Sequence, residues 1–251
     1  LLNICDLYQC DALFKMTPLM YAQKSNCLAN EIKILKQQNN NLIDLPIDQI
    51  VNILYYATVC EYVEVIEHLY LEMSTSFSRP RARLLNSRKS IFNAKNKMGM
   101  TLLYLASERD HEKIVKYLLI LGADINFRST DGITPLYVAC QKGHENILEL
   151  LVTLGANINL GNVKGATPLY IACEVGNENI VKRLIAHGAN INQSRKIGAT
   201  PLYIACQFGY ENIVELLIKS GAKVNLDTVK GATPLMISSQ EGHIKVVERL
   251  L

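Results

Sequence analysis

The sequence predicts an all-α fold in which helix-turn-helix units, joined by hairpin loops, stack into a helical-repeat solenoid. The first observation is a spacing of 33 residues, which separates Gly99, Gly132, Gly165, Gly198 and Gly231. The second is the segment Thr-Pro-Leu-Tyr-x-Ala-Cys, which three of the units share, and the third is the ending Gly-Ala-x-Ile/Val-Asn. Self-similarity at a period of about 20–50 residues is typical of stacked repeat proteins.

The first helix of each unit is predicted to begin directly after a threonine. Thr134 and its equivalents suit the residue before a helix, because the hydroxyl accepts a hydrogen bond from an otherwise unpaired backbone N–H. Pro135 fits the first helical position, where the missing N–H has no partner anyway. We expect this helix to end near Gly143, because glycine readily adopts the left-handed conformation that closes helices.

A second helix is predicted from about Glu145 to Leu154, where apolar residues recur at helical spacing, and Gly155 is expected to end it. The following stretch, 157–164, is rich in turn-forming residues and is predicted to project as a hairpin loop. One such helix pair cannot bury its own apolar face. Neighbouring units must therefore stack and share one elongated core.

These motifs resemble the ankyrin repeat, whose pattern is Gly-x-Thr-Pro-Leu-x-x-Ala, then Gly-His-x-x-Ile-Val, then Gly-Ala-x-x-Asn. The resemblance covers about residues 96–251. Departures are mild: residues such as Tyr137 stand where the family usually has His, and Asp110 replaces the glycine between the helices. We expect the repeated tyrosines to stack along the inner helices as structural residues, with a ligand site as the alternative.

The resemblance implies a single ankyrin-repeat domain over residues 1–251, with about seven repeats, two of them degenerate. The degenerate repeats are expected at 1–45 and at 46–98, and the second carries a basic loop inserted at 74–97. The regular repeats are expected at 99–131, 132–164, 165–197 and 198–230, followed by a truncated repeat at 231–251.

The charge is small overall but uneven along the chain. The formal net charge is +3, which argues against wholesale attraction to nucleic acid or to a membrane. The inserted loop 74–97 holds seven Lys and Arg residues and no Asp or Glu. It is interpreted as a solvated loop, as a contact for an acidic or phosphorylated partner, or as a switch that is phosphorylated at Ser87 or Ser90.

Cysteine usage predicts an intracellular protein, in the cytoplasm or, as the alternative, the nucleus. The chain has seven cysteines, an odd number in a chain too large to need disulfides. Cys140, Cys173 and Cys206 are 33 residues apart. In stacked repeats this spacing puts them beyond the reach of a disulfide, so we expect buried thiols in a reducing compartment. No apolar run approaches the roughly 18 residues of a transmembrane span.

No motif for catalysis, for a cofactor or for a metal ion is visible, so the sequence predicts a non-enzymatic scaffold that binds another protein. The histidines of the Gly-His position, His111, His144 and His243, are expected to make local hydrogen bonds. Leu1 is not an initiator methionine and Leu251 falls inside a predicted helix, so we expect further chain on both sides. This leaves an alternative open: a regulatory or substrate-docking module of a larger enzyme, channel or ubiquitin ligase.

The resemblance also implies where the partner binds, namely on the concave groove made by the loop tips and the exposed ends of the inner helices. The sequence predicts a hydrophobic stripe flanked by lysines, with Phe208 as its strongest anchor, made of Val163, Val175, Ile197, Phe208 and Val229. The alternative is that its valines pack against the neighbouring loop. The predicted partner-binding residues are Arg128, Thr130, Asp131, Ile133, Gln141, Lys142, Val163, Lys164, Glu174, Val175, Lys196, Ile197, Gln207, Phe208, Val229 and Lys230.

Overall fold

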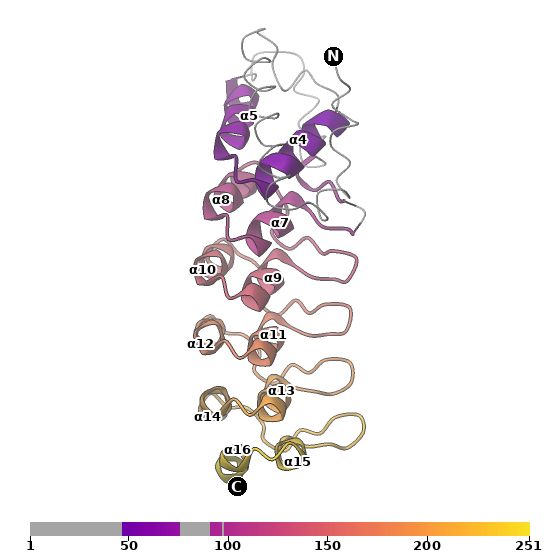
Figure 1. Ribbon diagram of the computed structural model, residues 1–251, viewed down its shortest axis with the longest axis vertical. Coiled ribbons are helices and arrows are strands. Elements are labelled where there is room, and N and C mark those ends of the chain that lie inside the picture. The colour runs from indigo at the N-terminus through magenta and orange to yellow at the C-terminus, as the bar shows by residue number, and fades with distance from the viewer. Residues whose placement is uncertain (1–46, 76–90, 97) are drawn as a thin grey trace. The chain divides into compact units, whose positions relative to one another are not determined.

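The computed structural model describes residues 47–75, 91–96 and 98–251 (Figure 1). These residues form paired helices, and none of them lies in a strand. They divide into two compact units, one ending at Phe127 and the other running from Arg128 to Leu251. The predicted all-α helical-repeat solenoid is confirmed. The single domain over 1–251 and its repeat boundaries stay predictions.

The first unit contains two helix pairs within the described residues. Their helices are α4 (Ile47–Val59), α5 (Val63–Thr75), α7 (Leu102–Glu108) and α8 (Glu112–Ile120). Helix α4 packs on α7, and α5 packs on α8. The hydroxyl of Tyr117 on α8 donates to the Glu67 carboxylate on α5 at 2.6 Å, which ties the second helices of the two pairs together.

Helices α4 and α5 occupy the place of the second degenerate repeat, but each has 13 residues, against 7 in α7. The repeat predicted at 1–45 lies outside the described residues. So does most of the basic loop, of which 74–75 belong to α5 and 91–96 are described. Asp110 adopts a φ of 63°, the left-handed conformation expected of the glycine that it replaces.

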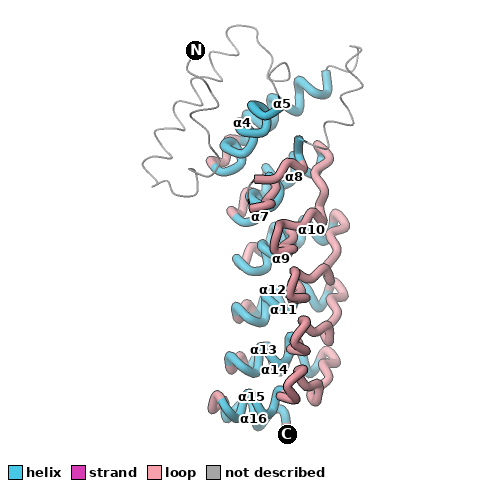
Figure 2. Tube along the Cα trace, turned by 90° about the vertical axis from the view of Figure 1, so that its right-hand side faces the viewer, coloured by secondary structure: helices cyan, strands magenta, loops and turns pink. Residues whose placement is uncertain are grey.

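The second unit consists of four helix pairs. Their helices are α9 (Pro135–Lys142), α10 (Glu145–Thr153), α11 (Pro168–Val175), α12 (Glu178–Ala186), α13 (Pro201–Phe208), α14 (Glu211–Lys219), α15 (Pro234–Gln240) and α16 (Ile244–Leu250). The first helices of successive pairs pack on one another and form an inner row, and the second helices form an outer row (Figure 1). The loops project beyond the inner row (Figure 1), and they form a column on the side that faces the viewer in Figure 2.

The inner helices of the second unit begin and end where the sequence predicts. The hydroxyl of Thr167 accepts a hydrogen bond from the backbone N–H of Tyr170 at 3.1 Å, and Pro168 occupies the first turn of α11. Gly176 closes that helix with a φ of 75°. A Cβ at this glycine would also lie 2.6 Å from the ring of Tyr210, so both the backbone angle and the close packing require glycine.

The core of the second unit lies between the two rows of helices. In the pair α11–α12, Leu169, Ala172, Cys173 and Leu184 are buried. Burial raises the pKa of the Cys173 thiol, which therefore stays protonated and unreactive at neutral pH. The cysteines at 33-residue spacing are thus small core residues, as predicted.

Candidate partner-binding site

The loop tips of the second unit are joined by backbone hydrogen bonds. The N–H of Val163 donates to the carbonyl of Asp131 at 2.9 Å. One repeat later, the N–H of Lys196 donates to the carbonyl of Lys164 at 2.8 Å, and the N–H of Val229 donates to that of Ile197 at 3.0 Å. Because each tip is tied to the next, the side chains at the tips stand in a row on a fixed backbone.

Three of these four tips carry one apolar side chain and one lysine. The pairs are Val163-Lys164, Lys196-Ile197 and Val229-Lys230, with the order reversed in the middle tip. The first tip, Thr130-Asp131, is polar and acidic instead. All of these residues are exposed. The surface therefore becomes cationic and apolar along the row, from Val163 to Lys230.

A groove with a volume of about 650 Å³ lies between these loop tips and the ends of α11 and α13. Phe208 forms its wall on the helix side, and Ile197 and Val229 form the wall on the loop side. These three side chains are 47%, 55% and 78% exposed. Ala199 and Ile204 also line the groove and are buried.

None of the sixteen predicted partner-binding residues is buried. The groove brings together seven of them, namely Glu174, Lys196, Ile197, Gln207, Phe208, Val229 and Lys230. The other nine lie outside this groove, and they include Val163 and Val175, which are 46% and 43% exposed. Packing against neighbouring loops therefore leaves a large part of each valine in contact with solvent.

Arg128, one of the nine, has a structural contact. Its Nη2 donates to the carbonyl of Gly161 at 2.6 Å, and its Nε donates to the carbonyl of Gly132 at 3.3 Å. The guanidinium thus links two successive loops. Its role as a partner contact stays a prediction.

Arg195 is a groove residue that the sequence reasoning missed. Its Cζ lies 5.4 Å from the centre of the Tyr170 ring, and its Nη1 donates to the Tyr170 hydroxyl at 3.2 Å. This hydrogen bond raises the pKa of Arg195 above its ordinary value, so the side chain is a permanent cation. Its Nε is buried and has no hydrogen-bond partner among the described residues. Thr228, also missed, lines the groove as well, and so do Tyr170 and Tyr203, for which a ligand site was the alternative interpretation.

A sequence signal for Arg195 did exist. At 33-residue spacing its position is otherwise occupied by Asn96, Ser129, Asn162 and Thr228. Each of these four accepts a backbone N–H of its own loop on the side-chain oxygen, as Asn162 does from Ala166 at 3.0 Å. Arginine has no acceptor atom and cannot make this bond. The break in the series therefore marks a residue with another task.

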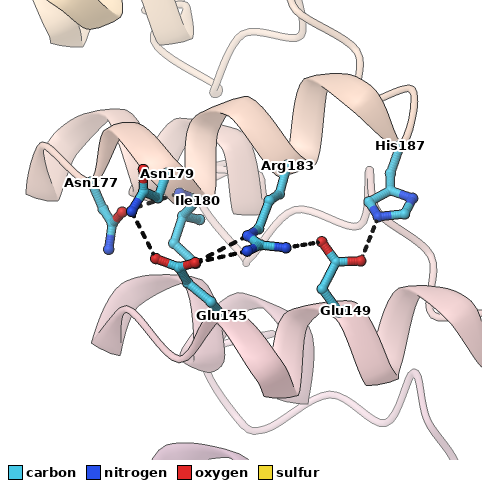
Figure 3. A network of polar contacts seen from close by, with 7 residues as sticks. All are labelled: Glu145, Glu149, Asn177, Asn179, Ile180, Arg183 and His187. Carbon is cyan, nitrogen blue, oxygen red and sulfur yellow. Dashed lines mark hydrogen bonds and ion pairs between the residues drawn. The ribbon is translucent and has the colours of Figure 1, made fainter.

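The outer row of helices carries a different kind of polar surface, in which charges pair with one another (Figure 3). Arg183 on α12 donates from Nη1 to Glu149 at 2.7 Å and approaches Glu145 with Nη2 at 3.0 Å, both on α10. Nε2 of His187 lies 2.8 Å from the other oxygen of Glu149. The hydrogen bonds from Arg183 and His187 lower the pKa of Glu149 below its ordinary value.

The same arrangement recurs between the next outer helices. Asn212 on α14 donates to Glu178 on α12 at 3.0 Å. Lys245 and Arg249 on α16 pair with Glu211 and Glu215 on α14. The polar ladder on the outer row therefore joins consecutive repeats.

A metal site and a membrane span are both absent from the described part of the chain. No cluster of three or more His, Cys, Asp or Glu residues is arranged to hold a metal ion within 47–75, 91–96 and 98–251. In the same ranges, every helix is too short or too polar to cross a membrane. Two histidines of the Gly-His position contact the preceding helix pair instead of making the local hydrogen bonds that were expected: Nε2 of His243 lies 3.0 Å from the carbonyl of Gln207, and Nδ1 of His111 lies 3.5 Å from the Glu61 carboxylate.

Stacked helix pairs with a row of exposed loop tips define a helical-repeat protein. A family model described as ankyrin repeats (3 copies) matches residues 119–195 and 192–251, and a single ankyrin repeat model matches 98–130. The chain belongs to the ankyrin repeat family. No curated protein matches the sequence. Ankyrin repeats form a non-catalytic fold that generally binds other proteins. The matches give no support to the alternative of a module in a larger enzyme, channel or ligase.

Proposed function

We propose that this chain is a non-enzymatic scaffold that binds a partner protein through the groove between its loop tips and inner helices. The observation that carries the proposal is the exposure of Ile197, Phe208 and Val229 in one groove. Exposed apolar side chains that gather in a concavity with a polar rim are typical of interaction sites. Aromatic residues such as Phe208 contribute much of the binding free energy in protein interfaces.

The fixed backbone of the loop tips supports the same proposal. Since successive tips are hydrogen-bonded to one another, the groove loses little conformational freedom when a partner binds. The outer helices offer no comparable surface between α10 and α12, because their polar side chains are engaged with one another.

The proposal can be tested by selection from a phage library of random peptides. A length of about 16 residues provides one extended segment that can follow the groove. Peptides enriched on the wild-type chain are bound again to two double variants. Phe208→Ala/Ile197→Ala removes two apolar side chains of the groove walls, and the control Leu154→Ala/Ile244→Ala removes side chains of similar exposure just after α10 and at the start of α16. We expect binding to fall at least about tenfold in the first variant, as for other interface anchors, and to persist in the control. Equal binding to both would show that the groove is not the binding site.

A further inference from the structure

The charges of the groove point to the kind of partner that it takes. Arg195, Lys196 and Lys230 line it, against a single carboxylate, Glu174, so the lining carries a net charge of +2. Neither Lys196 nor Lys230 forms an ion pair with any residue that the structure describes. On the outer helices, by contrast, Glu149, Glu178 and Glu215 each have basic or amide partners in the neighbouring repeat. Two positive charges of the groove thus have no ion pair within the described residues, whereas these three carboxylates of the outer row are paired.

Arg195 is held in a position to use its charge. Its guanidinium lies over the Tyr170 ring and is fixed there by one hydrogen bond from Nη1. Since Nε is buried, the donors that remain for a ligand are those of Nη2 and the second N–H of Nη1. A planar guanidinium presents parallel donors that match a carboxylate. Since the other repeats have short polar side chains that brace their own loop at this position, Arg195 gives up a bracing bond. The loss of this loop hydrogen bond leaves the guanidinium available to a ligand, which is consistent with a role in binding.

On the loop wall of the groove, two lysines flank two neighbouring apolar side chains. Lys196 precedes Ile197 in one tip, and Val229 precedes Lys230 in the next, and these tips are bonded at 3.0 Å. A ligand that follows this wall meets a cation, an apolar side chain, a second apolar side chain and a second cation. A volume of about 650 Å³ suits one large side chain together with its chain neighbours.

We propose that the groove binds an extended acidic segment of the partner protein. One large apolar side chain of that segment inserts between Ile197, Phe208 and Val229. Asp or Glu residues on either side of it pair with Lys196, with Lys230 and with the guanidinium of Arg195. This inference rests on the function proposed above and adds the chemistry of the partner.

A nucleic acid fits the groove less well. Glu174 lies in the lining and would face a phosphate backbone, and Asp131 stands on the first loop tip of the same row. The loop wall interleaves lysines with aliphatic side chains, whereas single strands bind on several stacked aromatic platforms.

The enriched peptides from the selection described above provide the first test. We expect them to contain an excess of Asp and Glu around one large apolar residue, relative to the unselected library. If the enriched peptides bind at the groove without such an excess, the inference of an acidic partner segment is wrong, while the proposed function still holds. Peptides that bind Phe208→Ala/Ile197→Ala as well as they bind the wild type would overturn both.

The second test measures the affinity of one synthetic enriched peptide by fluorescence anisotropy. Lys196→Gln/Lys230→Gln should weaken binding about tenfold or more at low salt, and the wild-type affinity should fall as salt is added. The matched control Lys113→Gln/Lys223→Gln removes two exposed lysines elsewhere and should bind as the wild type does. Arg195→Lys keeps the charge but not the planar donors, and should also weaken binding.

Two further outcomes would overturn the inference. One is equal affinity of Lys196→Gln/Lys230→Gln and its control. The other is a fluorescent 16-nucleotide single strand that binds the wild type more tightly than the peptide and loses affinity in Lys196→Gln/Lys230→Gln, which would assign the cations to phosphates.

Discussion

The outer helices and the loop-tip groove of the second unit contain similar residues and use them in opposite ways. On the outer row, Arg183 is shared between Glu145 and Glu149, and Leu184 beside it is fully buried. At the groove, Lys196 has no ion pair with any described residue, and Ile197 beside it is 55% exposed. In each case a cation is followed by a large aliphatic residue. Only on the outer row, however, is the cation ion-paired and the aliphatic side chain buried within the protein.

This difference teaches how a repeat protein can separate stability from recognition. Contacts between consecutive outer helices, such as those of α10 with α12, add up along the array and hold the repeats together. The loop tips are already fixed by backbone hydrogen bonds, which do not depend on the identity of their side chains. Side chains at the tips can therefore vary from repeat to repeat without loss of the fold, as the change from Asp131 to Lys164 illustrates.

The largest expected difference in stability is between alanine variants of the two aliphatic residues in this comparison. Leu184→Ala leaves a cavity between the helix rows and should lower the free energy of unfolding by about 2–5 kcal/mol. Ile197→Ala removes a side chain that is 55% exposed and should change it by less than about 0.5 kcal/mol. Urea denaturation followed by circular dichroism compares the two variants. Similar losses would mean that the groove wall belongs to the core.

A smaller effect separates the two ends of one inner helix, α11. Thr167→Ala removes the hydrogen bond to the N–H of Tyr170 at the start of the helix and should cost about 1 kcal/mol. Val175→Ala, at the end of the same helix and 43% exposed, should cost less than about 0.5 kcal/mol. Thermal melts of the two variants check the difference, and Thr167→Ser should restore most of the loss.

The helix boundaries were predictable because each depends on local chemistry. Thr134, Pro135 and Gly143 determine the start and end of α9 without reference to distant residues, and the structure places them as predicted. The greater length of α4 and α5 was not predictable in this way, since no threonine, proline or glycine of the regular pattern marks their bounds.

The candidate site was predictable only in part, for a related reason. The positions of Phe208 and Ile197 follow from the repeat register, and so does their exposure. The place of the Arg195 guanidinium does not, because a long flexible side chain is positioned by the ring of Tyr170, 25 residues earlier in the chain. The series of short polar residues that Arg195 interrupts indicates that it differs, but not where it points.

The ladder of the outer row should make stability depend on pH. Because Arg183 and His187 lower the pKa of Glu149, this carboxylate stabilises the folded state above its unfolded pKa, and the effect is lost as the pH falls through the folded pKa. Glu149→Gln should therefore be less stable than the wild type at pH 7, by roughly 0.2–1 kcal/mol because the pair is partly exposed and screened. The urea midpoints of the two proteins should approach each other as the pH falls below the usual range of a carboxylate. A gap that persists there, or that 1 M NaCl (a Debye length of about 3 Å) leaves unchanged, would contradict the ion-pair explanation.

The smallest expected effect concerns the cations of the groove. Lys196→Gln/Lys230→Gln removes two exposed charges that have no ion pair among the described residues, and the loop bond of residue 196 is made by its backbone N–H. The free energy of unfolding should therefore change by less than about 0.5 kcal/mol, and low salt should not reveal a loss, since removing neighbouring like charges relieves repulsion. Thermal melts at low and high salt measure this. A fall of several degrees would mean that the two lysines stabilise the fold, and the division between a paired outer row and an unpaired groove would then be wrong.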